Sequence, residues 1–403
     1  MRPMRLALVL LASPLACADN SGGETDAPAT TTTGTAGTSG ASSTTSGTSS
    51  GDVPTGDGPT SEGSSSTTSD EPPPMLTIVA LEDLGLLPLP SEVTAGRDGG
   101  QGGRLGGRLL WTFGDTFLTA KNPVDDSNVL SATAAWSDPD DPLALVQPVD
   151  QGGFPAQFIP YTPDELAANK ADALNGWALW PGGLFDTGEP DGLVVFQRIK
   201  RTDGSGFDSV GIGTARVAVD ATVAVRDPVD LFAPPEPLFV PGAVVDGYAL
   251  AFACETTGFL AVGCKLARAP IEQAGVRAAY EFHDGSGWQA DIGLAVNVFA
   301  EFSGPPSISY NPYLQRYLAV CGQILSSTIE LRTAEDVAGP WSEPVTIEIG
   351  EEYLGPLDPN AFNYVIREHD SLRAPDGRAV VLSYSRPTEP FRGDVRLLRV
   401  TFG

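Results

Sequence analysis

A polar turn followed by an apolar run of strand length occurs five times in the chain. The turns contain Gly-Gly, Asp-Gly or Asn-Pro, and the runs are rich in Val, Leu, Phe, Tyr and Trp, which are residues typical of strands. Such self-similarity at intervals of this length predicts a repeat architecture. The five copies lie at 106–113, 191–196, 246–252, 311–320 and 376–384.

A second motif, a small or apolar residue next to an arginine, follows each of the four later copies. In the first unit the segment 131–136 occupies the equivalent place. Each unit is therefore expected to be an antiparallel sheet of three or four strands. A β-propeller blade fits this pattern better than a β-sandwich, in which one period would not repeat five times. The four arginines are Arg216, Arg268, Arg332 and Arg399.

The two ends of the repeat region predict how the ring closes. A lone apolar strand at 76–81 precedes the first unit, and the last unit ends near Phe402 without an outer strand. We expect the first strand to complete the last unit. Helix is expected only as a turn or two beginning at Pro163 and at Pro270. The prediction is an all-β, five-bladed β-propeller over residues 75–403.

The first 17 residues have the pattern of a secretion signal. Arg2 and Arg5 precede an apolar run at 6–12, which is too short to span a bilayer as a helix. The protein is therefore expected to be exported. Leu-Ala-Cys17 resembles the acylation site of bacterial lipoproteins, so Cys17 is a candidate lipid anchor to a membrane. The alternative is an ordinary cleavage site at 16–18, which would release a secreted protein.

Residues 18–74 have the composition of a disordered linker. They contain 12 Ser, 14 Thr and 10 Gly, with no aromatic residue, Leu or Ile. Such a segment cannot bury enough apolar surface to offset the entropy lost on ordering. We expect a flexible stalk between the signal and the propeller.

Charge and histidine content exclude several classes of function. The chain has 51 Asp and Glu against 24 Lys and Arg, a formal net charge of -27, so nucleic acid is not an expected partner. Two histidines in 403 residues cannot supply the usual zinc sites. No metal and no cofactor are expected.

The cysteines fit an exported protein. Cys254 and Cys264 flank a segment that reads as a strand, a turn and a returning strand, which would bring the two sulfurs together across a hairpin. In an oxidising compartment we expect a disulfide; the alternative is two buried thiols. Cys321 lies in an apolar run and is expected to be a core residue.

Polar residues at the inner edge of the expected ring are the candidate site residues. Innermost strands carry side chains to the mouth of the axial channel of a propeller, where ligands bind. In the first unit these residues are Arg97 and Asp98, and Asp115 ends the next strand. In the later units they include Glu301 and the run 367–370.

Carboxylates without histidine clusters suit glycoside hydrolysis, which needs two carboxyl groups on opposite sides of the scissile bond and no metal. Asp98 is the candidate base or nucleophile. Asp115 is either the second carboxylate or a neighbour that adjusts the pKa of Asp98 by repulsion. The candidate general acids, in descending order, are Glu301, Glu255 and Glu368. The candidates for binding the sugar are Arg97, Glu368 and His369.

Two stretches resemble domain of unknown function family 4185. One is Thr-Ala-Gly-Arg-Asp-Gly-Gly at 94–100 with Trp-Thr-Phe-Gly-Asp-Thr-Phe at 111–117, and the other comprises Tyr-Asn-Pro at 310–312 and Gly-Pro-Trp-Ser at 339–342. The resemblance covers nearly all of 80–403 except 167–188. It implies a five-bladed propeller related to the furanosidase and sialidase propellers, some members being endo-D-arabinanases of glycoside hydrolase family 183. The resemblance implies a polysaccharide partner such as D-arabinan, and the chain is expected to act as a monomer.

A structural interpretation of the two aspartates competes with catalysis. Asp98 precedes two glycines and Asp115 precedes Thr116, so both also suit turns in which an Asp side chain accepts backbone N–H bonds. The protein would then be a non-catalytic propeller for carbohydrate binding or adhesion. A serine hydrolase is not expected, because His369 has no Gly-x-Ser-x-Gly motif to act with.

Overall fold

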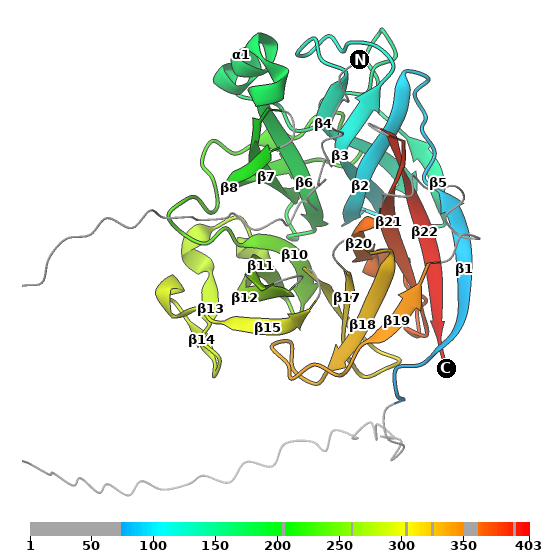
Figure 1. Ribbon diagram of the computed structural model, residues 1–403, viewed down its shortest axis with the longest axis vertical. Coiled ribbons are helices and arrows are strands. Elements are labelled where there is room, and N and C mark those ends of the chain that lie inside the picture. The colour runs from blue at the N-terminus through cyan, green and yellow to red at the C-terminus, as the bar shows by residue number, and fades with distance from the viewer. Residues whose placement is uncertain are drawn as a thin grey trace, which may run out of the picture. The chain divides into compact units, whose positions relative to one another are not determined.

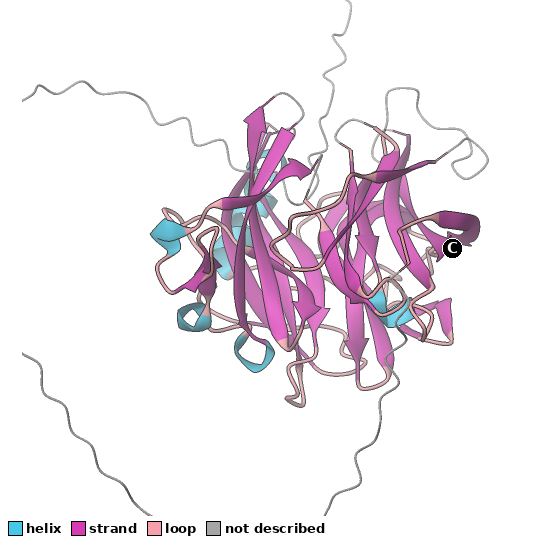
Figure 2. Cartoon of the chain, turned by 90° about the horizontal axis from the view of Figure 1, so that it is seen from below, coloured by secondary structure: helices cyan, strands magenta, loops and turns pink. Residues whose placement is uncertain are grey.

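Five antiparallel sheets stand around a common axis and form a five-bladed β-propeller (Figure 1). The computed structural model describes residues 74–203, 206–258, 261–302, 305–323, 326–349, 362–389 and 392–403. The signal, Cys17 and the linker up to residue 73 lie outside these ranges. Figure 2 shows that strands make up nearly all of the described chain. The all-β, five-bladed prediction is confirmed.

The first strand of each blade lies innermost, where it contacts the first strands of the neighbouring blades. Blade 1 contains β2 (Thr94–Leu105), β3 (Arg108–Leu118), β4 (Val129–Asp138) and β5 (Asp141–Val146). Blade 2 contains β6 (Trp177–Phe185), β7 (Gly192–Thr202), β8 (Gly206–Val217) and β9 (Val225–Arg226). Blade 3 contains β10 (Val240–Val245), β11 (Tyr248–Gly258), β12 (Ala261–Pro270), β13 (Glu281–His283) and β14 (Trp288–Gln289), with β15 (Asn297–Phe302) paired to β12.

Blades 4 and 5 complete the ring. Blade 4 contains β16 (Ser307–Asn311), β17 (Arg316–Gly322), β18 (Thr328–Ala334) and β19 (Val345–Glu348). Blade 5 contains β20 (Tyr364–Glu368), β21 (Ala379–Glu389), β22 (Arg392–Phe402) and β1 (Ile78–Leu86). The helices of the described residues are α1 (Pro163–Ala171) and the 3-10 turns Ala173–Asn175, Ile271–Gln273, Arg277–Ala279, Ile292–Leu294 and Asp370–Leu372. None of them is long and apolar enough to cross a membrane.

The repeated motifs correspond to the same two strands of every blade. The turn and apolar run form the first hairpin and the second strand, β3, β7, β11, β17 or β21. The arginine motif lies in the third strand, where segment 131–136 of β4 takes the same position. One placement differs from expectation. Glu301 is not on the innermost strand of blade 4 but on β15, which joins the sheet of blade 3.

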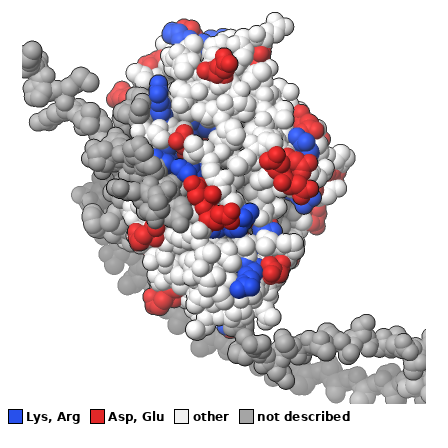
Figure 3. Space-filling view, turned by 90° about the vertical axis from the view of Figure 1, so that its right-hand side faces the viewer, with Lys and Arg blue, Asp and Glu red and all other residues white. Residues whose placement is uncertain are grey.

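The N-terminal strand closes the ring, as the sequence predicts. β1 pairs antiparallel with β22, with Ile78 opposite Phe402 and Leu86 opposite Arg396. The pairing removes an open sheet edge and joins two segments from opposite ends of the fold. Ion pairs of Arg396 with Asp83 and of Arg399 with Glu82 add to the contact. Figure 3 shows acidic side chains beside basic ones on the face that lies to the right in Figure 1.

The apolar core lies between the blades, since the strands bury both faces. Five clusters of buried side chains each combine residues from two neighbouring blades. Between blades 1 and 2 these include Trp136 and Phe196, and between blades 5 and 1 they include Val395 and Trp111. Burial of this apolar surface is the main favourable term in holding the ring together.

Helix α1 has a defined start and is held against blade 2 by ion pairs. Thr162 and Glu165 form a capping box at the start of α1, with Pro163 in the first turn. Glu165 also pairs with Arg198 and Arg226, which ties the helix to blade 2.

The cysteines of the described chain lie in blades 3 and 4. Cys254 and Cys264 lie directly opposite each other in the β11–β12 pair and form a disulfide. Cys321 is fully buried in β17.

Candidate active site

Asp98 and Asp115 meet at the inner edge of blade 1. Asp98 is on β2, and its Oδ1 accepts a hydrogen bond from the backbone N–H of Asp115 on β3, at 2.7 Å. The strand pairing is irregular here, because Arg97 faces Thr116 and Gly99 faces Phe113, so Asp98 opposes two residues of β3. A bulge of this kind re-aims side chains and leaves a backbone donor unpaired. The N–H of Asp115 is therefore available to the carboxylate.

Glycines make this close approach possible. A Cβ added at Gly114 would lie 2.6 Å from Oδ1 of Asp98, so a larger residue would displace the carboxylate. Gly99 and Gly100 have φ values of 94° and 74°, which L-residues rarely adopt. The run Arg-Asp-Gly-Gly thus encodes the irregular backbone that presents Asp98.

Side chains from the two neighbouring blades converge on the two carboxylates of blade 1. From blade 5, the Tyr364 hydroxyl donates to Oδ2 of Asp98 at 2.9 Å. From blade 2, Trp180 Nε1 and an Arg201 guanidinium nitrogen donate to Oδ1 of Asp115 at 3.1 and 3.0 Å. Blades 5 and 2 both flank blade 1, so their side chains can meet across it only near the axis of the ring. Asp98 and Asp115 thus belong to the axial region.

The two aspartates are electrostatically different. Burial, and then the negative charge of Asp115, raise the pKa of Asp98 to about 7, although hydrogen bonds from Asp115 N–H and Tyr364 oppose the shift. Asp115 has the Arg201 guanidinium as its counter-ion. Burial and the Asp98 charge raise the pKa of Tyr364 well above its usual value, so its hydroxyl keeps its proton and donates. Asp98 can therefore gain or lose a proton near neutral pH.

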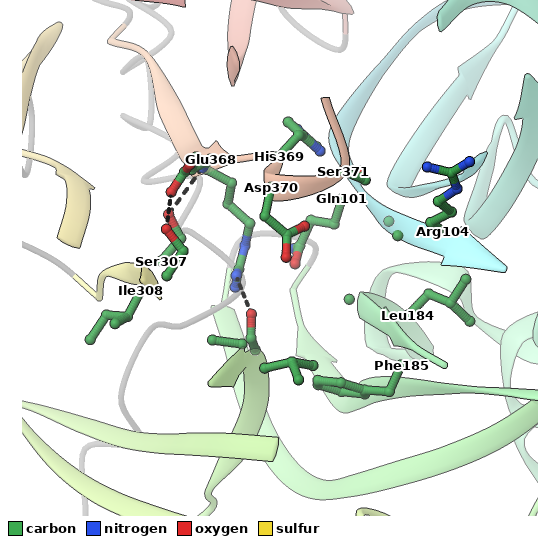
Figure 4. A pocket seen from close by; sticks show the side chains of 18 of the residues that line it. Gln101, Arg104, Leu184, Phe185, Ser307, Ile308, Glu368, His369, Asp370 and Ser371 are labelled. Carbon is green, nitrogen blue, oxygen red and sulfur yellow. Dashed lines mark hydrogen bonds between the residues drawn. The ribbon is translucent and has the colours of Figure 1, made fainter. Parts of the chain in front are cut away.

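A cavity of about 340 Å³ lies at the other end of the innermost strands (Figure 4). Neither Asp98 nor Asp115 lines it. Tyr364, which contacts Asp98, and Glu368, which lines the cavity, are four residues apart on β20, roughly 13 Å along a strand. The axial region thus has an Asp98 end and a cavity end. The cavity is lined by residues 101–104 of β2, 183–186 at the end of β6, 242–244 of β10, 307–309 of β16 and 367–371 from β20 onward.

Glu368 and His369 lie at the cavity end. Glu368 accepts hydrogen bonds from Arg373 Nε at 2.9 Å and from Ser309 Oγ at 2.5 Å. Burial raises its pKa, although the charge of Arg373 opposes the shift. His369 packs against Trp111, and its Nε2 lies 2.8 Å from Ser383 Oγ. Burial, followed by the charge of Arg367, lowers the pKa of His369 to about 3, so this imidazole is neutral.

Arg97 and Glu255 lie apart from both groups. Arg97 has no exposed surface, and its guanidinium lies 3.6 Å above the Phe113 ring and donates to Pro88 O. Strand alternation explains this, since neighbouring residues such as Arg97 and Asp98 point to opposite faces. Glu255 is exposed on β11 and accepts from Asn297 at 3.3 Å. The backbone of Glu301 is in β15, and its side chain lies outside what the structure describes.

Three contacts of the carboxylate pair were missing from the sequence interpretation: Trp180, Arg201 and Tyr364. Each comes from a different blade than Asp98, and Tyr364 lies 266 residues away from it. No local pattern marks them, so only the closed ring reveals their role. Among the described residues, no group of three His, Cys, Asp or Glu side chains could hold a metal ion.

Comparisons with known proteins give structural similarity only. No protein-family model matches the chain. No curated protein sequence matches it. The resemblance to domain of unknown function family 4185 and to glycoside hydrolase family 183 therefore stays a prediction.

Several solved propeller structures are similar in fold. A family 117 glycoside hydrolase of the marine bacterium Zobellia galactanivorans matches with 11% identity and a TM-score of 0.47, over 80% of this chain and 90% of that one. A GH43_1 enzyme from Xanthomonas citri matches with 13% identity and a TM-score of 0.44, over 78% and 89%. An exo-β-1,3-galactanase from Phanerochaete chrysosporium matches with 11% identity and a TM-score of 0.44, over 76% and 63%.

Proposed function

We propose that the protein is a glycoside hydrolase that cleaves a polysaccharide at the Asp98 end of the axial region. The observation that supports this most strongly is the pair of neighbouring carboxylates, with the pKa of Asp98 raised to about 7. An acid–base group is most effective when its pKa lies near the working pH. Glycoside hydrolysis uses carboxyl groups in this way and requires no metal.

Asp98 is the proposed base or nucleophile, acting in its charged form. Tyr364 donates to one of its oxygens and the Asp115 N–H donates to the other, so the carboxylate is held in one orientation. Asp115 is the proposed neighbour that adjusts Asp98, since its charge is one of the causes that raise the pKa of Asp98. Arg201 and Trp180 fix Asp115 in turn.

The proton donor is a separate carboxyl group in this proposal. Acid and base lie about 5 to 9.5 Å apart, on opposite sides of the scissile bond, whereas the Asp115 main chain is hydrogen-bonded to Asp98 itself. We assign the role of general acid first to Glu301 on β15; Glu255, the next candidate in the sequence, is exposed on β11 and lies apart from Asp98. Glu368 is the weakest candidate, because it lines the cavity end and is paired with Arg373.

The resemblance to family 4185 makes D-arabinan the first substrate to test. The sequence of residues 1–17 supports export, and Cys17 supports a lipid anchor that holds an outward-facing monomer on a flexible stalk. Secretion without an anchor follows if Cys17 is not acylated.

A non-catalytic carbohydrate-binding propeller is the alternative. One observation favours it: both carboxylate oxygens of Asp98 already accept hydrogen bonds from the protein, as those of a structural aspartate would.

The deciding experiment assays the full-length protein on D-arabinan, L-arabinan and a sialylated glycan. Asp98→Asn is compared with wild type and with Asp140→Asn, which removes a charge from an exposed turn between β4 and β5. Hydrolysis should fall by at least about 1,000-fold in Asp98→Asn and stay within about twofold in Asp140→Asn, with glycan binding retained in both. Binding without hydrolysis by the wild type would support the alternative. An Asp98→Asn variant with more than a tenth of the wild-type rate would overturn the assignment of Asp98.

A further inference from the structure

The cavity end of the axial region contains an arginine that lacks a counter-ion. Arg367 lines the cavity, and its guanidinium makes one long hydrogen bond, from an NH1 nitrogen to Gly242 O at 3.4 Å. No carboxylate of the described residues lies within ion-pair distance of it, whereas its neighbour Glu368 is paired with Arg373. Burial lowers the pKa of Arg367 to about 10, and no neighbouring charge contributes. Arg367 is only partly exposed, and a partly buried cation without a partner is costly, so an anion in the cavity would stabilise it.

The same cavity contains an acceptor that lacks a donor. Gln101 is 3% exposed and lines the cavity, and its side-chain carbonyl has no hydrogen-bond partner in the described structure. Buried polar atoms are nearly always satisfied, so an unpaired oxygen indicates a missing partner. Figure 4 shows the side chains of Gln101 and Asp370 pointing into the cavity. The side-chain oxygen of Gln101 and the carboxylate of Asp370 would both accept hydrogen bonds from hydroxyl groups of a ligand.

The size and the wall of the cavity limit what fits. Its volume of about 340 Å³ is at the lower end of small-molecule sites, about right for one sugar unit. Leu184 and Phe185 lie on one side of the cavity, and Ile308 lies on another side, next to Ser307. At Gly183 an added Cβ would meet nothing nearer than 3.9 Å, so the glycine leaves this part of the cavity open.

We propose that the cavity binds a small acidic sugar, with its carboxylate paired to Arg367 and its hydroxyl groups donating to Gln101 and Asp370. The unpaired cation favours the acid group, and the unpaired Gln101 oxygen and the exposed Asp370 carboxylate favour the hydroxyls. The site is distinct from the Asp98 end, whose residues do not line the cavity.

The test is calorimetric titration of the full-length protein with sodium D-glucuronate, with D-glucose as the uncharged probe of nearly the same shape. Glucuronate should bind at least tenfold more tightly than glucose. Arg367→Gln should weaken glucuronate binding by about 10–100-fold, the usual effect of losing a charged hydrogen bond, and leave glucose unaffected. Arg216→Gln, which removes an exposed arginine from β8, is the matched control and should change neither.

A second variant keeps the test decisive if Arg367→Gln does not fold. Gly183→Ala places a methyl group in the cavity without a clash and should weaken both probes, whereas Gly287→Ala, in the turn before β14, should not. Three results would overturn the proposal: no glucuronate binding to the wild type, unchanged binding in folded Arg367→Gln, or unchanged binding in Gly183→Ala. Loss of glucuronate binding in Asp98→Asn but not in Arg367→Gln would also overturn it, by placing the ligand at the other end.

Discussion

The two ends of the axial region place buried carboxylates in opposite electrostatic surroundings. At both ends an innermost strand carries the acid, and burial raises its pKa. At the Asp98 end a second carboxylate adds to the effect of burial, and the hydrogen-bond donors are a neutral backbone N–H and a phenol. At the cavity end Arg373 opposes burial and holds Glu368 in a salt bridge. The Asp98 carboxyl is held by neutral donors, and the Glu368 carboxyl is paired with a cation.

The largest expected difference between the two ends is in hydrolysis. Asp98→Asn keeps the shape of the side chain but removes the charge that acts as base or nucleophile. We expect a loss of at least about 1,000-fold in kcat, or about 4 kcal/mol in barrier height. Glu368→Gln should leave kcat of the folded protein within tenfold of wild type. Comparable losses in the two variants would end the functional distinction between the two ends.

The second expected difference is in stability, where Glu368→Gln should have the larger effect and Asp98→Asn the smaller one. Glu368→Gln leaves Arg373 buried without its counter-ion, and breaking a buried ion pair costs about 3–5 kcal/mol. Asp98→Asn should not lower the free energy of unfolding by more than about 1 kcal/mol, because the amide oxygen can accept from the Asp115 N–H and the amide nitrogen can donate to the Tyr364 hydroxyl, which then accepts. Urea unfolding of the two variants measures this. An Asp98→Asn variant that unfolds as easily as Glu368→Gln would make Asp98 a structural residue.

The sequence contained enough information for the ring but not for the site. The repeated turn and apolar run mark the second strand of every blade, because a strand buried on both faces is continuously apolar. The lone strand at 76–81 and the missing outer strand of the last unit predicted the ring closure. These signals are local or lie at the ends of the repeat region, so they can be read without coordinates.

The composition of the site depends on contacts between blades. Tyr364, Trp180 and Arg201 reach the Asp98 pair only after the ring closes. The sequence interpretation grouped Arg97 with Asp98, although strand alternation turns them to opposite faces. It also grouped Glu368 and His369 with Asp98 as parts of one channel mouth, and the structure places them at the cavity end. The position of a residue on or near an innermost strand therefore predicts that it lies in the axial region, but not at which of the two ends.

The pH profile of hydrolysis tests whether Asp115 tunes Asp98. The repulsion from Asp115 raises the pKa of Asp98, so Asp115→Asn should lower that pKa. Because Asp98 acts in its charged form, the acidic limb of kcat/KM should move to lower pH by about one unit. Glu368→Gln should leave the limb in place, since Glu368 is not among the groups that shift Asp98. If the acidic limb of the profile is unchanged in Asp115→Asn, or moves to higher pH, Asp115 does not adjust the pKa of Asp98.

A further expected effect is a pH-dependent stabilisation by Asp98→Asn. The folded protein holds the Asp98 proton with a pKa of about 7, whereas the unfolded chain releases it near the ordinary value of about 3.9. The folded state therefore binds more protons between these values, and the wild type loses stability as pH rises from about 4 to about 7.

Asn does not titrate, so the variant escapes this loss. We expect the two proteins to melt together near pH 4 and the variant to melt several degrees higher at pH 8, because raising the pKa from about 3.9 to about 7 is worth up to about 4 kcal/mol. Glu165→Gln is the opposite control, because the pKa of Glu165 is lowered by its arginine partners and its removal should cost stability at pH 8. Equal melting temperatures of wild type and Asp98→Asn at pH 8 would show that Asp98 is ionised at little cost, and that the contrast between the two ends of the axial region is weaker than their geometry implies.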